Sequence, residues 1–146
     1  MKILQETHNR RIGWYDEEET ILLMEVFAPW SWQEAYEAIR FIVDIFEPIT
    51  TPRYVIYHYI GAGKLVPKDL AFMNIGRLLT VTLEYEGDLV FANASPLTNA
   101  FIDLVRKTTR QPSARLRLHY VDSLEVALKL IDKFKQQTLA NSDLQE

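Results

Sequence analysis

The sequence has no cysteine, no long apolar run and no excess of basic residues, and each absence excludes a class of protein. Without cysteine there is no disulfide framework, thiol nucleophile or cysteine-ligated metal. No apolar run approaches the roughly 20 residues of a bilayer span, and Met1–Glu6 becomes polar too soon for a signal peptide. The formal charge of −4 disfavours nucleic-acid binding, which needs a basic face. We therefore expect a cytoplasmic protein that binds no nucleic acid.

A further absence concerns one loop, at residues 60–69. The loop follows Tyr54–Tyr59, an aromatic and β-branched run typical of a buried strand, and it precedes a helical pattern. In strand–helix–strand proteins such a loop lies at the carboxyl end of a strand, where ligands and regulators bind. The loop contains no Ser, Thr, Cys or His. It therefore offers no hydroxyl for phosphorylation and no ordinary nucleophile.

The first part of the chain predicts a hairpin and then a helix. Segments 11–15 and 20–27 are strand-like, with the acidic turn 16–19 solvated between them. This turn lacks the alternating oxygen ligands and the glycine of a calcium loop, so a cation site is disfavoured. Ser31 and Glu34 have the spacing of a capping box and predict a helix start.

Later segments alternate between strand and helix patterns. Pro48 should end the first helix, Pro67 should lie in the first turn of the second, and Gly87 should lie near its end. The order β-β-α-β-α-β-α-β-α predicts an α/β fold, because parallel strands need crossover connections. We expect a mostly parallel five-stranded sheet, an antiparallel N-terminal hairpin strand and four helices. One domain should span residues 1–146, with a core of about 11–138 and a polar tail at 139–146.

Two apolar groups are candidates for binding. Trp30, Trp32 and Tyr36 gather at the start of the first helix, where they either staple and pack the core or form a contact surface. The second helix is apolar on more than one side, which is typical of a helix buried against something. This pattern predicts a homodimer face or an apolar ligand at the residues Phe72, Met73 and Leu79.

The polar candidates are weaker. Gly61-Ala62-Gly63-Lys64 lacks the further glycine and the following Ser or Thr of a phosphate loop, so these glycines are better explained by a positive-φ turn. Weak anion binding by Lys64, Lys68 and the helix start is an alternative. His58, beside the loop, is the one plausible acid–base residue, although a hydrogen-bonded structural histidine is the stronger interpretation. No metal or cofactor is predicted.

The element order and several local patterns resemble the STAS fold of anti-sigma-factor antagonists, in particular its divergent SpoIIAA-like branch. The resemblance lies in the hairpin from Trp14 to Phe27, the segment Ala28–Glu34 and the closing segment Val121–Leu128, and it covers about residues 11–135. Typical antagonists carry an Asp-x-Ser motif between the central strand and the second helix, and phosphorylation of that serine switches partner binding. The corresponding segment here, residues 58–69, has no Ser or Thr. The resemblance therefore implies a STAS-like module that is not phospho-switched.

Two functions are consistent with these observations. The first is a non-enzymatic protein-interaction and regulatory module, acting as a homodimer, whose contact surface comprises Gly61, Gly63, Lys64, Lys68, Asp69, Trp30, Trp32 and Tyr36. The second follows from the likeness of the SpoIIAA-like branch to lipid-binding CRAL-TRIO domains. It is a carrier or sensor of a lipid or other apolar small ligand, held between the second helix and the sheet. A small enzyme that uses His58 is a third, minor option.

Overall fold

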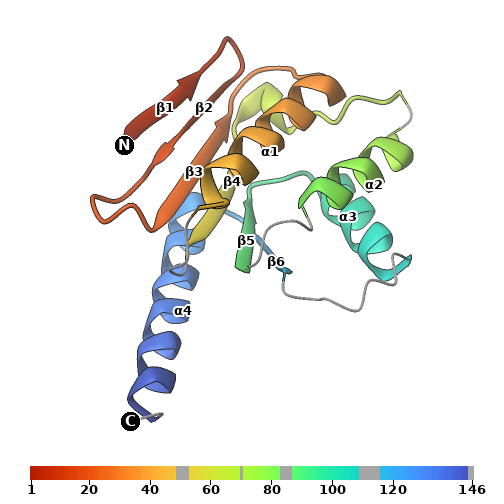
Figure 1. Ribbon diagram of the computed structural model, residues 1–146. Helices are drawn as coiled ribbons and strands as arrows, with labels where there is room; N and C mark the ends of the chain where they lie inside the picture. The colour runs from red at the N-terminus through yellow and green to blue at the C-terminus, as the bar shows by residue number, and fades with distance from the viewer. Residues whose placement is uncertain (49–52, 70, 83–86, 109–115, 145–146) are drawn as a thin grey trace.

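A six-stranded sheet forms the centre of the protein in a computed structural model (Figure 1). The structure describes residues 1–48, 53–69, 71–82, 87–108 and 116–144. In spatial order the strands are β1 (Lys2–Glu6), β2 (Arg10–Trp14), β3 (Ile21–Val26), β4 (Tyr54–Tyr59), β5 (Gly87–Ala92) and β6 (Leu116–Val121). β1, β2 and β3 pair antiparallel, and β3 to β6 pair parallel. The predicted α/β class and antiparallel N-terminal hairpin are thus confirmed.

Helices cover both faces of the sheet. They are α1 (Trp32–Phe46), the 3₁₀ turn η1 (Gly61–Lys64), α2 (Ala71–Thr82), α3 (Pro96–Thr108) and α4 (Leu124–Leu144). Apolar residues of α1 and α2 pack on one face of the sheet, whereas those of α4 pack on the other. Since side chains alternate along a strand, each central strand contributes to both cores. In β4, for example, Val55 and Tyr57 face α1 and α2, and Tyr54 and Ile56 face α4.

The prediction of five strands was wrong, because β1 adds a sixth at the N-terminal edge. Its apolar side chains Ile3 and Leu4 are both exposed. The segment therefore lacks the alternation of buried apolar and exposed polar residues by which a strand is recognised in a sequence. The strand is held instead by backbone pairing with β2. Gly13 permits this pairing, since a Cβ atom there would lie 2.3 Å from the carbonyl oxygen of Lys2.

Three predicted boundaries also need correction. α2 begins at Ala71, so Pro67 lies in the preceding loop rather than in the first helical turn. Residues 83–86 lie outside the described residues, and Gly87, with φ of 137°, begins β5. The predicted polar tail is helical to Leu144, because α4 continues past the end of the sheet (Figure 1).

The first helix starts where its capping box predicted, and its apolar side chains face the sheet. The Ser31 hydroxyl accepts a hydrogen bond from the Glu34 backbone N–H, and the Glu34 carboxylate accepts one from the Ser31 N–H. Ile39, Ile42 and Phe46 are buried against the sheet. α1 is therefore fixed over the strands, with Trp32 at its first position and Trp30 just before its cap both packed into the core on this face of the sheet.

Candidate functional site

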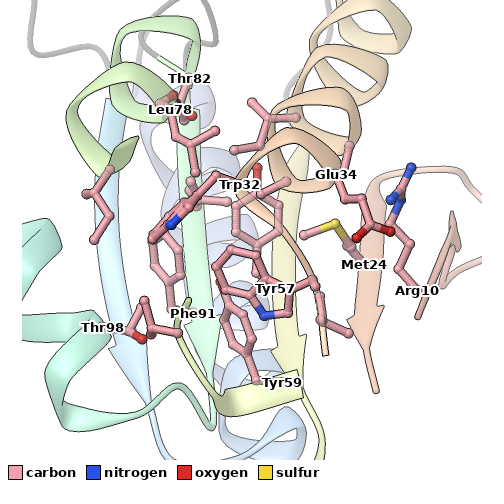
Figure 2. Close-up of a pocket in the computed structure, with 18 of the residues that line it drawn as sticks. Arg10, Met24, Trp32, Glu34, Tyr57, Tyr59, Leu78, Thr82, Phe91 and Thr98 are labelled. Carbon is pink, nitrogen blue, oxygen red and sulfur yellow. Dashed lines mark hydrogen bonds between the residues drawn. The ribbon is translucent and has the colours of Figure 1, made fainter. Parts of the chain in front are cut away.

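An apolar pocket of about 100 Å³ lies between α1, α2 and the sheet (Figure 2). α1 and the segment before it contribute Trp30, Trp32, Ala35 and Ile39, and α2 contributes Ile75, Leu78 and Thr82. The sheet supplies a floor that consists of Met24, Val26, Tyr57, Tyr59, Leu89, Phe91 and Leu118. The pocket thus lies where an apolar ligand was expected, between the second helix and the sheet.

Five aromatic residues contribute to the mostly apolar pocket wall. The rings of Trp30 and Trp32 meet edge to face with centroids 5.2 Å apart, and Tyr57 and Phe91 make a similar contact at 5.4 Å. The Trp30 indole N–H donates to the carbonyl oxygen of Gly63, 2.9 Å away, which fixes that ring against the loop after β4. Burial raises the pKa of Tyr59 above its usual range.

Few polar side chains reach the pocket. Arg10 and Glu34 give one charge of each sign; Arg10 donates from Nε to Gln5, and Glu34 is engaged in the capping box. Burial raises the pKa of Glu34, but hydrogen bonds from Ser31 and Asn9 outweigh that effect and hold the pKa below its usual range. A wall of aliphatic and aromatic side chains with a few placed polar groups is typical of small-molecule sites.

The aromatic residues at the start of α1 were expected either to pack in the core or to form a contact surface, and the structure places them differently. Trp32 is 8% exposed and lines the pocket, so it does not belong to an exposed contact surface as we had predicted. Trp30 is half-buried in the same wall. Tyr36 points elsewhere: it is half-buried, and the Arg77 guanidinium lies 4.8 Å from its ring centroid. Trp32 is the first residue of α1, directly after the Ser31 cap, and this position explains why it is buried.

The loop after β4 is built into the fold more firmly than its sequence suggested. Gly63 is buried, and a Cβ atom there would lie 2.1 Å from the carbonyl oxygen of Val26. The Lys64 ammonium donates to Asn93 at 3.2 Å. Gly61 is exposed with φ of 51°, which confirms a positive-φ turn at one of the two glycines. Only the outer residues, Lys68 and Asp69 among them, are exposed as a contact surface requires.

Among the described side chains of the second helix, the predicted residue Met73 does not line the pocket. Met73 is 62% exposed, and Ile75 and Leu78 line the pocket instead. The side chains of Phe72 and Leu79 lie outside the described residues. The apolar run of α2 did not reveal which positions face inward, because it has apolar residues on several sides. The contributions of Tyr57 and Phe91 come from strand alternation, a signal that the sequence contains.

His58 lies on the opposite face of the sheet. In β4 it points to the same side as Tyr54 and Ile56, which face α4, and it is not among the pocket residues. Burial lowers the pKa of His58, and the nearby charge of Glu25 raises it by less. Its Nδ1 atom has no hydrogen-bond partner among the described residues. The structure thus does not bring His58 together with the aromatic site.

A polar cluster occupies the same opposite face at β5 and β6. The Asp88 carboxylate accepts from Nε and Nη2 of Arg117 at 2.9 and 3.0 Å, and it lies 2.9 Å from Nε2 of His119. Burial raises the pKa of Asp88, but these contacts outweigh it and hold the pKa below its usual value. The His119 ring packs on Phe134 of α4, 4.8 Å between centroids. This cluster joins the edge strand β6 to its neighbour and to α4.

The described residues form neither a metal-binding cluster nor a membrane-spanning helix. In this part of the chain, no three His, Asp or Glu side chains are grouped so that they could hold a metal ion. Each helix within it is too short or too polar to cross a bilayer. Comparison of the chain with protein-family models, curated proteins and solved structures finds no match. The resemblance to the STAS fold therefore stays a prediction.

Proposed function

We propose that the protein is a carrier or sensor of a small, mostly apolar molecule, held between α1, α2 and the sheet. The observation that supports this function is the apolar pocket of about 100 Å³. Protein interiors are close-packed, with few voids larger than a water molecule. An apolar cavity of about 150 Å³ in another protein stays dry and binds benzene. A pocket of the present size would take a ring of about five or six carbons, or the end of a longer chain.

Native mass spectrometry of the purified protein tests the proposal. We expect an added mass under gentle conditions that is released on denaturation. A second measurement uses a small apolar probe, methylenecyclopentane, which should shift the amide signals of pocket residues in ¹H–¹⁵N spectra. These signals would include Val26, Tyr57 and Ile75. A protein that carries no added mass and does not respond to this probe would overturn the proposal.

Two variants of α1 identify the binding place. Ala35 is half-buried and lines the pocket, so Ala35→Phe should fill it and weaken probe binding at least about tenfold. Gln33 is exposed on the same helix, and Gln33→Phe should leave binding unchanged. Equal binding by both variants would place the probe somewhere else.

A second function, the STAS-like interaction module, is favoured by a different observation. Leu65 and Met73 are 68% and 62% exposed, and they lie on the loop and helix where we expected a partner surface. Exposed apolar side chains are enriched at protein contacts when they form a patch. If the protein is a homodimer through this segment, sedimentation equilibrium will show a dimer that Met73→Asp weakens. A wild-type monomer at micromolar concentration would contradict the homodimer.

A further inference from the structure

The indole N–H of Trp32 is a buried donor without an acceptor. Trp32 is 8% exposed, and its Nε1 atom has no hydrogen-bond partner among the described residues. A buried donor left unpaired costs about 1–3 kcal/mol, which is why most buried polar groups are paired. Trp30 provides the contrast: its indole N–H, in the same wall, donates to Gly63.

The unpaired donor belongs to the pocket wall. Figure 2 shows Trp32 between Leu78 of α2 and the rings of Tyr57 and Phe91 on the sheet. Other polar groups of the wall have partners within the protein: the Thr82 hydroxyl donates to the Leu78 carbonyl, and the Thr98 hydroxyl pairs with Ser95. Their hydrogen bonds are satisfied without a ligand, whereas that of Trp32 is not.

We infer that the pocket recognises a small apolar molecule that carries one neutral hydrogen-bond acceptor, such as a ketone, ester or amide carbonyl, and that Trp32 donates to it. This inference rests on the proposed function, which it narrows from any apolar molecule to one with an acceptor. A neutral acceptor is favoured over a carboxylate because the charged groups of the wall, Arg10 and Glu34, carry opposite signs. An anion near Arg10 would also meet the field of the Glu34 carboxylate.

A matched pair of probes isolates the hydrogen bond. Cyclopentanone and methylenecyclopentane have the same ring and nearly the same shape, but only the ketone has an acceptor oxygen. The ketone is better hydrated, so the informative quantity is the change in the ratio of the two dissociation constants between variants. Trp32→Phe keeps an aromatic ring and removes the N–H. We expect it to weaken ketone binding about fivefold to tenfold relative to hydrocarbon binding.

Trp30→Phe is the control variant. It removes an N–H whose acceptor is the Gly63 carbonyl, so it should leave the ratio of the two probes within about twofold of the wild type. The charged probe cyclopentanecarboxylate completes the set. We expect it to bind more weakly than the ketone; tighter binding that Trp32→Phe does not change would overturn the assignment of a neutral acceptor.

The wild-type protein gives an independent measurement should Trp32→Phe fail to fold. The chain has three tryptophans, so ¹H–¹⁵N spectra contain three indole signals, which Trp14→Phe and Trp30→Phe assign by subtraction. Cyclopentanone should move the Trp32 indole proton downfield, and methylenecyclopentane should not. If neither probe binds, the carrier function itself fails. If both bind and neither the ratio nor this proton responds to the acceptor, the carrier function stands and the role of Trp32 is wrong.

Discussion

At the scale of single residues, the pocket depends on side chains whose neighbours leave them little freedom. The indole of Trp30 is fixed by the Gly63 carbonyl, and Gly63 is itself pressed against the backbone of Val26 at the end of β3. One small residue thus sets the distance between the loop, the sheet and one wall of the pocket. A glycine in this position is required by close approach rather than by its backbone angles.

This contact predicts a large effect from adding one methyl group. In Gly63→Ala the new Cβ atom would meet the Val26 carbonyl oxygen, which is backbone and cannot rotate away. We expect the free energy of unfolding to fall by about 3 kcal/mol, as measured by urea titration. Ala62→Ser, at an exposed position of the same 3₁₀ turn, should change it by less than about 0.5 kcal/mol. A Gly63→Ala variant as stable as wild type would show that the loop can move off the sheet.

At the scale of elements, the start of α1 is set by nearby residues of its own segment, and the same helix also lines the pocket. Its capping box satisfies two backbone N–H groups, and the same Glu34 carboxylate also accepts from Asn9, 2.8 Å away, in the turn before β2. The cap therefore links the helix to the N-terminal hairpin as well as starting it. Trp32, one residue after the cap, takes its position from this start.

Removing the cap should loosen the helix start. Ser31→Ala removes the acceptor for the Glu34 N–H, and we expect a loss of about 1 kcal/mol in the free energy of unfolding, with a loss of only a few tenths for Ser31→Gly. Gln33→Ala, on the exposed side of the first turn, should have little effect. Thermal unfolding followed by circular dichroism measures all three. If Ser31→Ala and Gln33→Ala are equally mild, packing of Trp32 rather than capping fixes the start of α1.

At the scale of the whole molecule, ionisable groups on several elements each lower the stability of the folded protein as the pH falls. Burial makes the His58 pKa lower in the folded protein than in the unfolded chain. As the pH falls, the unfolded chain therefore binds a proton first, and the folded protein loses stability. Burial alone would raise the pKa of both Asp16 and Asp88. Hydrogen bonds, from Thr20 and Ile21 to Asp16 and from Arg117 and His119 to Asp88, outweigh it and keep both values lowered. The stability that these carboxylates supply is present above their unfolded pKa values and is lost as pH falls through the folded ones.

Stability should therefore fall in two pH windows, the first below about 6.5 and the second below about 4. Urea midpoints measured from pH 7.5 to pH 3 test this expectation. His58→Gln should remove the fall in the first window, and Asp88→Asn should reduce the fall in the second. A wild-type midpoint that is constant between pH 7.5 and 5 would contradict the contribution of His58.

Local sequence signals and tertiary contacts explain different parts of this protein. The capping box at Ser31, the buried run of β4 and the alternation of strands with helices were predictable, because each depends on hydrogen bonds or periodicities within one segment. β1 was missed because its pairing with β2 leaves Ile3 and Leu4 exposed. The pocket was expected under the second helix, but the predicted residue Met73 is exposed, and Ile75 and Leu78 line the pocket instead.

The sequence alone determined the α/β class, the antiparallel N-terminal hairpin and the absence of thiol chemistry. Only the tertiary structure decided that Trp32 faces inward with an unpaired N–H, that Gly63 presses on β3, and that His58 lies on the face opposite the pocket. Periodicity within a segment specifies which side of a helix or strand is apolar. It does not specify which other segment covers that side, and a pocket is made by residues that lie far apart in the chain.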